Sequence, residues 1–174
     1  MLDEMILAFS KGNIDLRRSE ISESETKLFD CLIIRLPENF SQLSNSEAKQ
    51  RYVSEFRPEV IYSDNTQNVN FAFNLLHNKN INLPVFLSKF IESIKLVYPN
   101  TLIYEEDNLI SDIEGCDIRY FEFRTSSLEG PIYNIMYLAS NGEKALMGTF
   151  NCPFGEYPNW KDMALGVIKT ILFE

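Results

Sequence analysis

The stretch Ile132–Asn151, IYNIMYLASNGEKALMGTFN, decides the fold of this chain. Asn141-Gly142 stands between two apolar runs, and Asn-Gly in that setting is the strongest short-range signal of a β-hairpin. In the first run, Ile132–Ala139, the residues that would point to either face of a strand are mostly apolar, which is typical of a strand covered on both faces. We therefore expect two antiparallel strands, the second over Lys144–Asn151, in a sheet with helices on both faces.

Further strands are predicted outward from this hairpin. Leu102–Ile113 and Asp117–Thr125 are separated by turn residues and extend the hairpin to an antiparallel meander. Val69–Leu75 alternates with polar residues at a period of two, so we expect one face to meet the core and the other to be polar. Val60–Tyr62 and Leu28–Leu36 are further strand candidates, and a proline ends the latter.

Three helices are predicted beside the sheet. Ser44 and Glu47 have the spacing of a capping box, which predicts a helix from Asn45 to Phe56. One apolar stripe follows Pro84 and another follows Pro158, and each is typical of a helix with one buried face. We expect five side chains of these two stripes to be mostly buried, namely Phe90, Ile94, Trp160, Ile168 and Ile171.

The whole chain, 1–174, is expected to form a single α+β domain. Its architecture would be one antiparallel sheet of about five to seven strands with helices on both faces, an α/β/α sandwich. Residues 1–27 are expected to be an N-terminal extension that packs on or beside the 28–174 sandwich. Within this extension, Leu2–Phe9 has the spacing of a short amphipathic helix, and Ser19–Thr26 is expected to be an exposed polar loop.

The charge balance bears on partners and location. Acidic residues outnumber basic ones 25 to 16, which gives a formal charge of −9. Nucleic acids and anionic membranes are held by lysine and arginine, so we expect neither as a partner. No stretch approaches the roughly 18 continuous apolar residues that suggest a membrane span. Three cysteines cannot form a complete disulfide framework, and we expect a cytoplasmic protein without membrane insertion.

Few residue types suit catalysis or metal binding. His77 is the one histidine, and the sequence lacks the usual motifs of nucleotide binding, of serine hydrolases and of zinc proteases. Carboxylates gather at Glu105-Glu106-Asp107 beside a predicted turn, where acidic side chains are usually solvated. We therefore expect no cofactor, no metal site and no enzymatic activity.

Residues between Leu28 and the C-terminus carry a family resemblance. They are Leu36-Pro37, Gly115, Tyr120, Gly148–Pro153, Trp160 and Ile168. Their order along the strands and the last helix resembles the sandwich shared by PsbP photosystem subunits, the Ran-binding import factor Mog-one and bacterial DcrB-like proteins. Soluble bacterial members include adaptor chaperones that load type VI secretion effectors, in which, the resemblance implies, the sheet cradles apolar effector helices.

These observations predict a non-enzymatic module that binds another protein, as an adaptor or chaperone of a secreted effector. An aromatic fraction of 13% supplies rings for an interface, and the candidate binding residues are Tyr120, Tyr133 and Tyr137. The alternative for these tyrosines is burial beneath the protein's own helices. Three other readings stay open: a small enzyme or ligand-binding protein with a carboxylate/Tyr pocket, a self-associating structural protein, and a homodimer.

Overall fold

The predicted hairpin lies at the centre of the structure. Strands β8 (Gly130–Ser140) and β9 (Ala145–Pro153) pair antiparallel along their whole length. Gly142 takes a φ of 89° in the turn between them, a left-handed conformation that glycine adopts without steric penalty. The structure is a computed structural model that describes residues 22–52, 57–66, 68–77 and 80–174.

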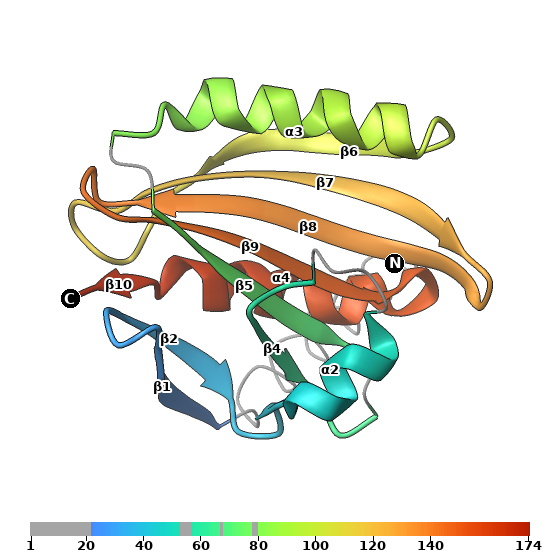
Figure 1. The fold of residues 1–174 in the computed structure, drawn as a ribbon, viewed down its shortest axis with the longest axis horizontal. Helices are drawn as coiled ribbons and strands as arrows, with labels where there is room; N and C mark the ends of the chain where they lie inside the picture. The colour runs from blue at the N-terminus through green and yellow to red at the C-terminus, as the bar shows by residue number, and fades with distance from the viewer. Residues whose placement is uncertain (1–21, 53–56, 67, 78–79) are drawn as a thin grey trace, which may run out of the picture.

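In the described part of the chain, seven strands form the large sheet, and all neighbouring strands are antiparallel (Figure 1). The expected antiparallel sheet is thereby confirmed, and β6 to β9 are the predicted meander. The order across the sheet is β3 (Ser41–Gln42), β4 (Val60–Ser63), β5 (Asn70–Leu76), β9, β8, β7 (Asp117–Ser127) and β6 (Leu102–Leu109).

Helix α3 (Leu83–Val97) covers one face of the sheet over β7 and β8 (Figure 1). The Asn82 side chain caps its start by accepting a hydrogen bond of 3.1 Å from the Val85 N–H. Phe90 and Ile94 pack against the apolar cluster between α3 and the sheet. Both side chains are half-buried, since they lie at the margin of the apolar stripe of α3. The fully buried contacts join Leu83, Leu87 and Ile91 to Phe121, Phe123, Met136 and Leu138.

Helix α2 (Asn45–Arg51) lies on the same face as α3, at the other end of the sheet. Its predicted capping box is confirmed, because the Ser44 N–H donates to Glu47 Oε2 at 2.8 Å and the Glu47 N–H donates to Ser44 Oγ. Ala72, which packs beneath α2, pairs with Thr149 on β9, and Thr149 pairs with Met136 on β8, which packs beneath α3. Cross-strand partners point to the same face, so the two helices leave a strip of that face between them.

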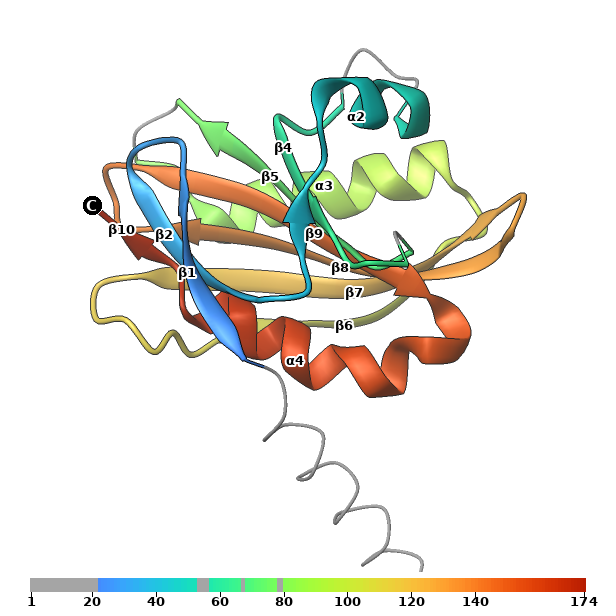
Figure 2. The ribbon, with the colours of Figure 1, turned by 90° about the horizontal axis from the view of Figure 1, so that it is seen from below.

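The opposite face is covered by helix α4 and by a second, three-stranded sheet (Figure 2). Helix α4 (Tyr157–Lys169) follows a short 3₁₀ turn, η1 (Phe154–Glu156). Ile168 and Ile171 are fully buried here as predicted, while Trp160 is half-buried with its ring edge-on to Phe40 at 6.2 Å. The second sheet has the order β1 (Glu23–Leu28), β2 (Leu32–Pro37) and β10 (Leu172–Phe173).

The second sheet corrects two predictions about the N-terminal part. The run predicted as one strand over Leu28–Leu36 is interrupted by a turn at Phe29–Cys31, so it belongs to two strands. The segment predicted as an exposed loop contains β1, whose residues 23–27 carry polar side chains to solvent while the backbone pairs with β2. The boundary expected at residue 27 therefore falls inside a strand, and the predicted Leu2–Phe9 helix lies outside the described residues.

Candidate functional site

The three tyrosines expected at an interface lie in the core. Tyr120, Tyr133 and Tyr137 are exposed by 6%, 1% and 0%. All three belong to the apolar cluster formed with α4 and the small sheet. Burial raises the pKa of the Tyr137 hydroxyl above its usual value. The expectation of exposed tyrosine anchors is therefore wrong for these residues, because the protein's own helix and second sheet cover them.

Tyr133 nevertheless forms part of a groove near the edge strand β6. The groove has a volume of about 230 Å³. Its aromatic rings form a continuous chain, with centroid distances of 6.3 Å from Tyr104 to Phe154, 5.2 Å from Phe154 to Tyr157 and 4.8 Å from Tyr157 to Tyr133. We call this site the aromatic groove, lined by Tyr104, Glu122, Tyr133, Phe154, Tyr157 and Lys161.

A buried carboxylate lies in the aromatic groove. Glu122 is 3% exposed on β7, and its two oxygens have different partners. The Tyr133 hydroxyl donates to Oε2 at 2.6 Å, and the Lys161 ammonium on α4 lies 2.6 Å from Oε1. Burial and the hydrogen bond to Glu122 raise the pKa of Tyr133, so it remains a donor at neutral pH. This is a carboxylate/Tyr pocket in which the ionised group is already paired.

Exposed apolar side chains gather along the segment that ends α3 and forms β6. The described part of the chain has nine large apolar side chains that are exposed, and six of them fall between residues 96 and 110. Tyr104 is 48% exposed, so it borders both the aromatic groove and solvent. We call these six side chains the β6 surface: Leu96, Val97, Tyr98, Leu102, Tyr104 and Ile110.

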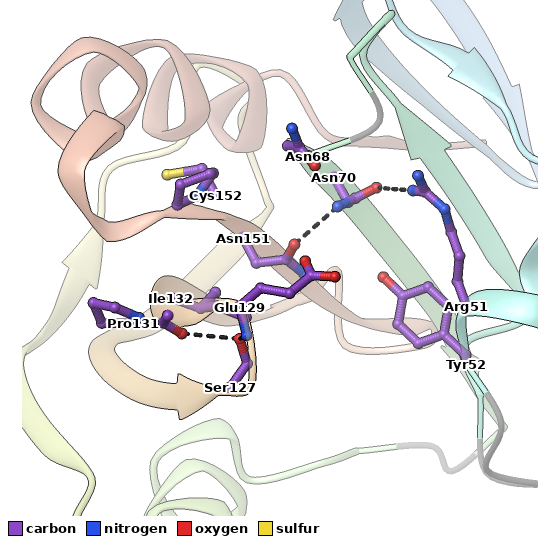
Figure 3. A pocket seen from close by; sticks show the side chains of 12 residues that line it. Arg51, Tyr52, Asn68, Asn70, Ser127, Glu129, Pro131, Ile132, Asn151 and Cys152 are labelled. Atoms are coloured by element: carbon purple, nitrogen blue, oxygen red, sulfur yellow. Dashed lines mark hydrogen bonds between the residues drawn. The ribbon is translucent and has the colours of Figure 1, made fainter.

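A second hollow, the polar cleft, lies on the sheet between the end of α2 and the β7–β8 turn (Figure 3). Its volume is about 580 Å³. The Asn70 amide donates to Asn151 Oδ1 at 3.0 Å, and the two residues are partners on β5 and β9. Asn70 Oδ1 accepts from Ser63 at 2.7 Å and from Arg51 at 3.5 Å. These bonds hold two carboxamides in fixed positions on the sheet.

The walls of the polar cleft carry opposite charges and a phenol. Arg51 and Tyr52 enter from the end of α2, while Glu129 enters from the β7–β8 turn (Figure 3). Burial raises the pKa of Tyr52, and its hydrogen bond with the Asn151 side chain partly opposes that rise. The arrangement offers donors and acceptors to a neutral or zwitterionic polar molecule.

Cys152, which lines the end of the polar cleft, gives the structure a defined response to alkaline pH. Burial raises the pKa of its thiol to about 12, whereas an unfolded thiol titrates near about 8.5. Above that value the unfolded chain loses a proton that the folded chain keeps. The free energy of unfolding should therefore fall by about 1.4 kcal/mol per pH unit from this group alone.

Urea unfolding of the wild type and of Cys152→Ala at pH 8.0, 8.75 and 9.5 measures this dependence. The free energy of unfolding should fall more steeply with pH in the wild type than in Cys152→Ala. This difference between the two slopes should disappear below pH 8. The alanine variant also loses packing, but that loss is the same at each pH and does not change the slope. Equal slopes would show that the thiol ionises as readily in the folded chain as in the unfolded one.

Two observations on the described residues concern metals and membranes. Among them, no group of three His, Cys, Asp or Glu side chains is arranged to hold a metal ion. Nor is any helix in the described ranges long and apolar enough to cross a bilayer. His77, at the end of β5, is exposed.

Sequence reasoning found Tyr133 but missed the other residues of both hollows. Tyr104 lies in a strand that the sequence predicts, and its signal is an aromatic residue directly before an acidic run. Asn70 and Asn151 lie on predicted strands as polar residues of the alternating pattern. Their meeting depends on β5 pairing with β9, which sequence order does not reveal.

Neither protein-family models nor curated sequences match this chain. Among solved structures, the cyanobacterial PsbP (CyanoP) of Synechocystis matches with a TM-score of 0.65 at 11% identity, over 88% of this chain and 94% of that one. The fold is PsbP-like. LpqN, involved in cell envelope biogenesis of Mycobacterium tuberculosis, matches with a TM-score of 0.56 at 13% identity, over 90% and 93%.

A Pseudomonas aeruginosa protein of unknown function matches with a TM-score of 0.50 at 8% identity, over 86% of this chain and 96% of that one. Identities this low show the fold and nothing finer, because one fold hosts many functions. The resemblance to PsbP is confirmed at the level of the fold.

Proposed function

We propose that this chain is a non-enzymatic protein-binding module whose binding site is the β6 surface together with the aromatic groove. The observation that carries the proposal is the concentration of six of the nine exposed large apolar side chains of the described part within residues 96–110. Five of the six flank the short connection between α3 and β6, while Ile110 follows the far end of β6. Contiguous exposed apolar side chains are typical of partner sites, whereas scattered ones need no explanation.

The aromatic groove supplies the pocket that such an interface needs. Its volume of about 230 Å³ suits one large side chain of a partner. Tyr104 and Phe154 line it with their rings stacked, and Arg124 lies over the Phe154 ring at 5.3 Å. Aromatic and arginine side chains around a pocket are the usual anchors of protein interfaces.

The chemistry of the groove supports binding in preference to catalysis. A general base needs a free acceptor at the reacting proton. In the groove, each oxygen of Glu122 already has one partner, because Oε2 accepts a hydrogen bond from Tyr133 and Oε1 forms an ion pair with Lys161. The raised pKa of Tyr133 also keeps its proton in place at neutral pH.

The narrower form of the proposal is a cytoplasmic adaptor or chaperone for a secreted effector, like the soluble DcrB-like proteins. The PsbP-like fold is compatible with this assignment. The described cysteines, Cys31, Cys116 and Cys152, are all free thiols, which suits a reducing compartment. The apolar β6 surface would then receive an apolar part of the effector.

Site-specific photocrosslinking in the native host tests the proposed function. A photoreactive phenylalanine analogue in place of Tyr104 should give a discrete adduct with one partner protein. The matched control carries the same analogue in place of Lys49, which is exposed on α2 toward the end of the sheet opposite β6. Identical adduct patterns from the two positions would reject the β6 surface as the binding site.

Polar substitution of the same surface provides the second measurement. Val97→Ser combined with Leu102→Ser should reduce the adduct formed at position 104 by about tenfold or more, since interface anchors each contribute more than about 1 kcal/mol. Both side chains are exposed, so the melting temperature should not change. A lower melting temperature would assign these residues to the fold instead.

A second candidate function is the binding of a small polar molecule in the polar cleft. The specific observation is the fixed pair of carboxamides, Asn70 and Asn151, between Arg51 and Glu129. A thermal-shift screen with free amino acids and monosaccharides at 10 mM tests this idea. Stabilisation that Asn151→Leu abolishes would support a ligand site there, and no stabilisation by any compound would reject it.

A further inference from the structure

We propose that the partner contributes an extended, basic segment that adds as an eighth strand to the outer edge of β6. This inference rests on the proposed function, because it specifies how the β6 surface is used. Three features of the structure support it: the open edge of the large sheet, the position of Tyr104 on that edge, and the charge of β6.

The sheet has two edges of very different length. Strand β3 at one end has two residues, whereas β6 at the other end has eight. Within the described ranges, no strand pairs with the outer side of β6. The outward N–H and C=O groups of an edge strand are a template for a further strand, and many peptide-binding domains capture their ligands in this way.

A bulge brings Tyr104 to the junction of this edge and the aromatic groove. Ile103 pairs with Phe123 and Glu105 pairs with Glu122, so Tyr104 is an extra residue without a partner on β7. Bulges commonly redirect a side chain next to a functional site. The Tyr104 ring stacks on Phe154 and borders the groove. One side chain of an added strand, next to Tyr104, would therefore lie over the groove.

The charge of β6 selects the kind of strand that can add. Its sequence contains the acidic run Glu105-Glu106-Asp107, and the whole chain has a formal charge of −9. A second copy pairing antiparallel through β6 would place acidic residues opposite acidic residues, which is destabilising. A strand with lysine or arginine would instead pair opposite charges across the edge. The acidic run thus disfavours self-association and favours a basic partner segment.

A synthetic peptide tests strand addition directly. The probe is a nine-residue fluorescent peptide of alternating lysine and valine with a central phenylalanine, and its counterpart has glutamate for lysine. Fluorescence anisotropy with the full chain should show at least about tenfold tighter binding of the lysine peptide. Asp107→Lys should reduce that preference, whereas Glu143→Lys, an equal charge change in the exposed β8–β9 turn, should leave it unchanged.

Backbone methylation separates strand addition from side-chain docking. Only every second peptide N–H of an added strand faces β6. Two versions of the lysine peptide, N-methylated at alternate residues in complementary sets, should therefore differ by at least about tenfold in affinity. Equal affinities would overturn strand addition while leaving the proposed function intact.

Two further outcomes also overturn the inference. One is that neither peptide binds at 1 mM, in which case the photocrosslink at position 104 still decides the proposed function independently. The other is that the chain forms a dimer by light scattering and Asp107→Lys alters that dimer, because the occupant of β6 would then be a second copy.

Discussion

Replacing Gly148 with alanine is expected to lower the free energy of unfolding by about 3 kcal/mol, at the upper end of the usual cost of overpacking. Gly148 on β9 lies opposite Tyr137 on β8. A Cβ at position 148 would fall 2.1 Å from Cζ of the Tyr137 ring. That ring is fully buried between the sheet and its cover, so it has no room to move aside. Equilibrium unfolding in urea measures the loss.

Two companion variants identify the cause. Gly166→Ala, on α4 with nothing within 4 Å of the added Cβ, should instead raise the free energy of unfolding by about 0.5–1 kcal/mol. Tyr137→Leu shortens the side chain above Gly148, so it should cost less in the Gly148→Ala background than in the wild type. Strictly additive losses would show that the tyrosine ring is not the group that excludes the methyl.

The sequence predicts the elements whose signals are local. The hairpin at Asn141-Gly142 follows from turn chemistry, and the start of α2 follows from the Ser44 and Glu47 capping box. Both signals act within a few residues, so no long-range contact is needed to interpret them. The helices α3 and α4 follow from wide apolar stripes for the same reason.

The second sheet could not be predicted in this way. Its β1–β2 turn places Phe29 and Asp30 at φ values of 54° and 56°. Non-glycine residues seldom adopt that left-handed conformation, and the turn contains no glycine that would mark it. The run from Leu28 therefore has the sequence pattern of one continuous strand. Strand β1 is polar because it lies at the edge of the small sheet, and the pairing of its backbone with β2 leaves no trace in its side-chain pattern.

For the candidate site as well, local sequence patterns predict the strands, whereas the contacts between distant segments could not be predicted. The apolar character of β8 on both faces predicts a cover, but the sequence does not reveal that α4 and the small sheet provide it over Tyr133 and Tyr137. The functional importance of Tyr104 depends on β6 being the last strand of the sheet. Strand order is a long-range property, so the pattern within Leu102–Leu109 could predict the strand and not its exposed edge.

The buried ion pair of the aromatic groove gives the second large expected effect. Lys161→Met should lower the free energy of unfolding by about 3 kcal/mol, because it leaves the carboxylate of Glu122 buried without its cation. Methionine keeps most of the length and apolar volume of the lysine side chain, so lost packing contributes little. Lys89→Met on the exposed side of α3 is the matched control and should change stability by less than about 0.5 kcal/mol.

Neutralising Glu122 should restore part of the stability that Lys161→Met loses. Glu122→Gln in the Lys161→Met background removes the unpaired charge but keeps an oxygen that accepts the Tyr133 hydrogen bond of 2.6 Å. The double variant should therefore be more stable than Lys161→Met alone, since a neutral buried pair avoids the desolvation cost of a lone ion. Urea unfolding of the four proteins in this cycle gives the coupling energy between the two side chains. A double variant that is less stable than Lys161→Met would show that the carboxylate does not depend on Lys161, and that other donors in the groove hold its charge.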